Sequence, residues 1–114
     1  MKKATIIHFG DPALRELALP IKAFHRKLHE LIDTIKLTLD ETEDAAALAA
    51  SQIAVAKRIT VIDYQGEFFE MVNPEITERS GSCGMVEGCL SVPGRRGYVT
   101  RPEKVTVRAQ DKDG

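Results

Sequence analysis

The sequence predicts a single α+β domain over residues 1–114, in which one long N-terminal helix packs on short, mostly antiparallel strands. Two patterns support this fold class. From Pro20 onward, apolar residues recur at three- and four-residue steps, which places them on one face of a helix: Ile21, Phe24, Leu28, Leu31, Ile32, Ile35 and Leu39. After residue 58, short β-branched and aromatic runs alternate with turn residues. Helical and strand segments grouped in this way are typical of α+β domains.

The remaining elements follow from local composition. Residues 4–9 are a short apolar run closed by Gly10-Asp11-Pro12, which predicts an extended arm and a turn. Residues 45–52 are small, so they allow close approach of a backbone or a ligand. The runs that predict strands are 59–64, 68–72, 75–79, 95–99 and 104–109. Asn73-Pro74 is expected to break the second from the third, residues 80–84 to form a loop, and residues 111–114 to be a turn that ends the chain in mid-hairpin.

Composition narrows the class of protein. Sixteen basic and seventeen acidic residues give a formal charge of −1, so no electrostatic feature points to nucleic acid or an anionic membrane as a partner. No apolar run approaches the roughly 20 residues of a membrane span. We therefore expect a soluble cytoplasmic protein. Cys83 and Cys89 are too few for a secreted disulfide scaffold or a four-cysteine zinc module, and a disulfide between them is not expected in the cytoplasm.

One segment is far more specific than the rest. Residues 87–94 read Glu-Gly-Cys-Leu-Ser-Val-Pro-Gly, and their first five match a signature of the peptide deformylases without a change. The order of the remaining features agrees: a Gly-Asp-Pro-x-Leu-Arg start at residue 10, an alanine-rich run ending in Gln52, then Asn73-Pro74 and Arg101-Pro102. The whole chain thus resembles this family, whose members are hydrolases that remove the formyl group from new bacterial proteins.

The resemblance implies roles for matching residues. Cys89 would be one of three protein ligands of a divalent metal, Fe²⁺ or alternatively Zn²⁺ or Ni²⁺, with an open position for water. The backbone N–H of Leu90 and the side-chain amide of Gln52 would bind the oxyanion. The substrate, a formylmethionyl peptide on ribosome-associated nascent chains, would lie beside residues of both motifs: Ala45, Ala46, Ala47, Glu87 and Gly88.

The sequence departs from the family pattern in two places. The usual Gly-x-Gly of the first motif is Ala45-Ala46-Ala47, and a following glycine is Ala54, so positive φ angles there would be strained. The family's other two metal ligands lie in a His-Glu-x-x-His helix, and no histidine follows His29 in this chain. The resemblance therefore implies a deformylase truncated before its metal-binding helix and inactive as this 114-residue chain. His25 and His29 have a helical i, i+4 spacing that can chelate a metal, but no third ligand is evident.

Two other functions remain open. A non-catalytic module with the same fold would bind an extended peptide along a sheet edge, and the alanines in place of glycines motivate that reading. A thiol enzyme would use Cys89 as its nucleophile, but it lacks a downstream histidine base. An unpaired strand at the C-terminal edge also predicts that the chain forms a homodimer.

Overall fold

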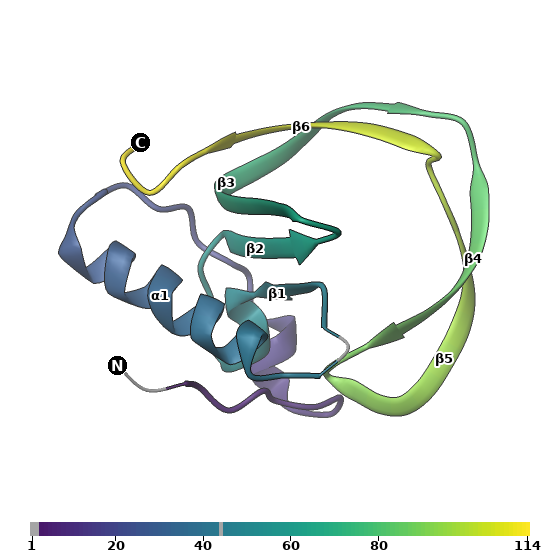
Figure 1. Ribbon diagram of the computed structural model, residues 1–114, viewed down its shortest axis with the longest axis horizontal. Helices are drawn as coiled ribbons and strands as arrows, with labels where there is room; N and C mark the ends of the chain where they lie inside the picture. Colours follow the sequence, from purple (N-terminus) through teal and green to yellow (C-terminus); the bar gives the residue numbers. More distant parts are fainter. Residues whose placement is uncertain (1–2, 44) are drawn as a thin grey trace.

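A four-stranded antiparallel sheet with one long helix against it forms the body of the protein (Figure 1). The computed structural model describes residues 3–43 and 45–114. The sheet has the order β1-β2-β3-β6, and a separate hairpin pairs β4 with β5. The elements, in chain order, are η1 (Pro12–Arg15), α1 (Arg26–Asp40), β1 (Ala47–Ala49), η2 (Ala50–Ile53), β2 (Ile59–Tyr64), β3 (Glu67–Ser80), β4 (Cys83–Cys89), β5 (Val92–Arg101) and β6 (Lys104–Gln110). The predicted α+β class is confirmed.

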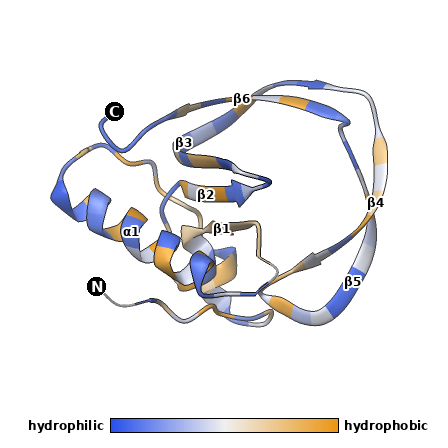
Figure 2. Ribbon diagram, viewed as in Figure 1, coloured by the Kyte–Doolittle hydropathy of each residue, from blue (hydrophilic) through white to orange (hydrophobic). Residues whose placement is uncertain are grey.

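The helix packs on the sheet through the periodic residues that predicted it. Leu28, Ile32, Ile35 and Leu39 are buried against apolar residues of β1, β2 and β3. Hydrophobic and hydrophilic residues alternate around α1 in Figure 2. Fully burying a side chain of this size contributes roughly 1.5–3 kcal/mol, so the contact between helix and sheet provides much of the stability of the core. The same contact holds β1, which leads into η2, and β2, which follows it.

The predicted start of this helix was wrong. It begins at Arg26, because His25 is the N-cap residue and its Nδ1 accepts a hydrogen bond from the N–H of Lys27. Residues 20–24 before it have no regular secondary structure. Ile21 is buried in the same core, but its N–H and C=O bond to the side-chain amide of Asn73, at 2.7 and 2.9 Å, in place of helical partners.

The two strands predicted on either side of Asn73-Pro74 are one strand, β3. Its first half pairs with β2 and its second half with β6, and the register with β6 shifts between Val72 and Glu75. Asn73 has φ 52°, a left-handed conformation that asparagine tolerates. Pro74 is accommodated because a bulge does not require its missing N–H. The loop expected at residues 80–84 is shorter than predicted, since β4 begins at Cys83.

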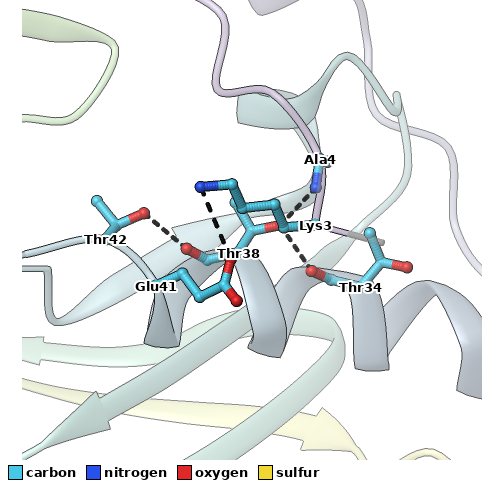
Figure 3. A network of polar contacts seen from close by, with 6 residues as sticks. All are labelled: Lys3, Ala4, Thr34, Thr38, Glu41 and Thr42. Atoms are coloured by element: carbon cyan, nitrogen blue, oxygen red, sulfur yellow. Dashed lines mark hydrogen bonds and ion pairs between the residues drawn. The ribbon is translucent and has the colours of Figure 1, made fainter. Parts of the chain in front are cut away.

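The N-terminal arm has no regular secondary structure over residues 3–8, leads into a turn at residues 9–10, and is held against α1. Thr38 is almost fully buried, and its Oγ1 accepts the N–H of Ala4 at 2.8 Å while donating to the carbonyl of Thr34 at 2.7 Å (Figure 3). An ion pair between Lys3 and Glu41 lies beside these bonds. The start of the arm is therefore attached to the helix.

The turn predicted at residues 111–114 is also present. Asp111 Oδ1 accepts the N–H of Asp113 at 2.8 Å, and the turn contacts α1 because His29 Nε2 lies 2.8 Å from the carbonyl oxygen of Lys112. Within residues 3–43 and 45–114, no helix is both long and apolar enough to cross a membrane.

Candidate active site

The β4–β5 hairpin presents Cys89 at its turn. Cys89 ends β4 and pairs with Val92, so Leu90 and Ser91 form a two-residue connection. Gly88 pairs with Arg96. One step along β4 thus corresponds to four along β5, which leaves residues 93–95 unpaired as a bulge, with the glycine at its centre at φ 75°. Residues 93–95 line the same cavity as Cys89.

Gln52 approaches this turn from η2 with a fixed orientation. Its Oε1 accepts the N–H of Ala49 at 3.0 Å. Its Nε2 then faces the hairpin, donating to Ser91 Oγ at 3.3 Å and lying 3.6 Å from Cys89 Sγ. Because the amide oxygen already has a donor, the NH₂ group is the part of Gln52 directed at the cysteine.

A cavity of about 950 Å³ connects these groups. It brings together seven of the eight site residues that the sequence predicted: Ala45, Ala46, Ala47, Gln52, Gly88, Cys89 and Leu90. Glu43 and the β5 bulge complete its wall. The cavity therefore lies between β1, the edge strand of the sheet, and the turn of the β4–β5 hairpin.

Glu87, the eighth, does not line this cavity. Both of its carboxylate oxygens accept from Arg101 Nε, at 3.0 and 2.8 Å. The hydrogen bond and the charge of Glu87 raise the pKa of Arg101 above its ordinary value. The pair joins β4 to β5, so Glu87 supports the hairpin that carries Cys89.

The strain expected at the first-motif alanines is absent. In the described part of the chain, the residues other than glycine with positive φ are Ala54, Gln65 and Asn73. Ala45 and Ala47 are not among them, and Ala45 packs against the core while Ala47 is exposed. Ala54, by contrast, is left-handed at φ 65° and ψ 27°, where it caps η2 directly after Gln52 and Ile53.

The two cysteines are free and exposed. They lie at opposite ends of β4, six residue steps apart along the strand, which corresponds to roughly 20 Å. This is far beyond the Cα separation that a disulfide allows. A disulfide between Cys83 and Cys89 within one chain is therefore excluded.

Comparison with known proteins identifies the family. A family model described as polypeptide deformylase matches residues 3–114. The chain belongs to the polypeptide deformylase family. The crystal structure of a peptide deformylase from Legionella pneumophila superimposes with a TM-score of 0.93 at 41% identity, covering 98% of this chain and 68% of that one.

Two further deformylase structures agree. The enzyme from Thermotoga maritima gives a TM-score of 0.91 at 32% identity, over 96% of this chain and 75% of that one. A class I type b peptide deformylase from Acinetobacter baumannii gives 0.93 at 33% identity, over 100% and 80%. The deformylase fold is thus shown over nearly all of this chain.

The deformylase family implies one divalent metal, and the described residues do not make up a complete site for it. No group of three or more His, Cys, Asp or Glu side chains in residues 3–43 and 45–114 is placed to hold a metal ion. Cys89 lines the cavity, but His25 caps α1 and His29 contacts the C-terminal turn. The proposed pair of helical histidines is therefore not formed, since His25 precedes the helix.

The sequence did not indicate the contacts that Ser91 and the N-terminal arm make at this site. Ser91 is 3% exposed, and its Oγ accepts from Gln52 while its carbonyl oxygen accepts the N–H of Phe9 at 2.6 Å. Ile7 donates its N–H to the carbonyl of Gln52 at 2.8 Å. Ser91 belongs to the five-residue signature, but its partners lie far away in sequence, so no local pattern pointed to them.

Proposed function

We propose that this chain carries the oxyanion-binding part of a deformylase site that acts on formylmethionyl peptides, including nascent chains on the ribosome. The observation that carries the proposal is the fixed side-chain amide of Gln52, whose NH₂ group faces the cavity at the Cys89 turn. Leu90, the next residue in that turn, supplies the second donor through its backbone N–H. The family match supports the reaction type.

The reaction is hydrolysis of a formyl amide. Water adds to the formyl carbon, the carbonyl oxygen becomes an oxyanion, and the C–N bond then breaks to give formate and a free amine. Gln52 Nε2 and the Leu90 N–H are the donors proposed for that oxyanion. Removing one preorganised donor of this kind typically lowers kcat by about 10²–10³.

We also propose that residues 1–114 alone do not turn over substrate. Cys89 is a candidate metal ligand, but the described residues do not complete a metal site around it. Incubation with formyl-Met-Ala-Ser and detection of free amine tests this directly. The expected result is no release above background, and robust turnover by the metal-supplemented chain would show that its own residues suffice.

A peptide-binding module without catalysis is the second candidate. It is favoured by the position of β1, an edge strand that borders the cavity and can accept an extended peptide. Isothermal titration with formyl-Met-Ala-Ser separates the candidates. Binding that survives a chelator supports the module, and binding that requires added Fe²⁺, Ni²⁺ or Zn²⁺ supports the enzyme site. Absence of binding in both conditions contradicts the module.

We also propose that the chain forms a homodimer. The far edge of the sheet is β6, whose residues are all exposed, and a strand edge of this kind can pair with a second copy. Sedimentation equilibrium measures the outcome, and a monomer at all accessible concentrations would contradict it.

A further inference from the structure

The β4–β5 hairpin is joined to the body of the protein at its turn by few polar contacts. Within residues 3–43 and 45–114, three hydrogen bonds connect side chains or backbone of residues 83–101 to the rest of the chain. Two come from Gln52 Nε2, to Cys89 Sγ and Ser91 Oγ, and the third comes from the N–H of Phe9 to the carbonyl of Ser91. Ser91 takes part in two of the three.

The geometry of these bonds is unequal. The bond to Ser91 Oγ, at 3.3 Å, is the shorter of the two from Gln52, and sulfur is a weak acceptor. Ser91 is also buried, so water does not readily compete with Gln52 for its hydroxyl group. The position of the Gln52 NH₂ group therefore depends more on Ser91 than on the cysteine that it faces.

The arm reinforces the same junction. Ile7 and Phe9 lie two residues apart in the arm, and their N–H groups bond to the carbonyls of Gln52 and Ser91. The arm thus links the η2 segment to the hairpin turn, while its start is attached to α1 through Thr38 (Figure 3).

We propose that Ser91 is a positioning residue, which holds the side-chain amide of Gln52 directed at the Cys89 turn and is itself held by the N-terminal arm. This inference deepens the proposed function, because it concerns how the same oxyanion donor is aimed. It is tested without any turnover, so a failure of deformylation and a failure of this inference give different results.

The experiment follows the Gln52 side-chain NH₂ resonances by ¹⁵N NMR in the full 114-residue chain. Ser91→Ala removes one neutral hydrogen bond, and the expected result is about fivefold faster hydrogen exchange at the Gln52 NH₂ group. Ser91→Thr keeps the hydroxyl and should retain slow exchange. Ser80→Ala, at an exposed serine of β3, is the matched control and should change nothing at Gln52.

Two outcomes would overturn the inference. One is unchanged Gln52 exchange in folded Ser91→Ala, and the other is faster exchange spread evenly over the chain, which would mean a general structural role. Should Ser91→Ala fail to fold, the pair Phe9→Pro and Phe9→Ala decides, because proline removes the N–H and alanine keeps it. Faster exchange at Gln52 in the proline variant alone supports the inference, and equal exchange in both variants contradicts it.

Discussion

Ala54→Gly is predicted to stabilise the protein, although it removes a side-chain atom. Ala54 is exposed and has φ 65°, so its methyl group contributes little packing while the backbone carries left-handed strain. An L-residue pays roughly 1–2 kcal/mol in this conformation, and glycine avoids that cost. This gain is partly offset, because glycine has more conformational freedom in the unfolded chain, which lowers the stability by about 0.5–1 kcal/mol. The net expectation is a gain of about 0.5–1 kcal/mol.

Thermal unfolding followed by circular dichroism measures this gain. An unfolding entropy of roughly 2.1 cal/mol/K per residue makes 1 kcal/mol equivalent to about 4 °C for a chain of this size. The expected rise in Tm is therefore about 2–4 °C. Ala56→Gly is a suitable control, because Ala56 lies two residues further along and is not left-handed. It should lower Tm.

Asn73→Gly extends the test, since Asn73 is also left-handed. Its side chain makes three hydrogen bonds, with the N–H and C=O of Ile21 and with Gln110. Loss of those bonds should outweigh the relief of strain and lower the stability. A destabilised Ala54→Gly, or a stabilised Asn73→Gly, would refute the reasoning that strain dominates at the first position and side-chain bonding at the second.

Three further outcomes are expected. Thr38→Val leaves the Ala4 N–H without its buried acceptor and should cost about 1–2 kcal/mol in urea unfolding. Thr42→Val, which loses a bond from the residue beyond the helix C-cap to the carbonyl of Thr38, should cost less; equal costs would contradict the role of the arm contact. Gln52→Ala should weaken formyl-Met-Ala-Ser binding about fivefold in calorimetry, and unchanged affinity would remove Gln52 from the peptide site. Ala47→Gly should alter peptide affinity by less than about threefold, because Ala47 is exposed and its backbone needs no positive φ; a larger gain would mean that the methyl group obstructs the peptide.

Local patterns were sufficient for the fold class and the main elements. Four of the five periodic residues within α1 are buried and Leu31 is partly buried, and the β-branched run at 59–64 is β2 with the expected bounds. The sequence patterns failed where contacts between residues far apart in the chain determine the local structure. Ile21 fits the helical period, but its backbone bonds to Asn73, 52 residues away, and it lies outside the helix.

The candidate site was predictable to the same degree. The Glu-Gly-Cys-Leu-Ser run indicated Cys89 and Leu90, and the alanine-rich run indicated Gln52; all three line one cavity. The part played by Ser91 was not predictable, because its hydroxyl and carbonyl bond to residues 39 and 82 positions earlier in the chain. Hydrogen bonds between residues so far apart in the sequence form only once the sheet and the hairpin are assembled.

Chemical-shift mapping with formyl-Met-Ala-Ser tests the central claim most directly. The claim is that the Gln52 side-chain amide and the Leu90 N–H form one binding site for a formyl carbonyl. Addition of the formylated peptide, with added metal, is predicted to shift these two signals together, and unformylated Met-Ala-Ser is predicted to shift them far less. Equal shifts with both peptides, or shifts confined to residues outside the cavity, would contradict the account.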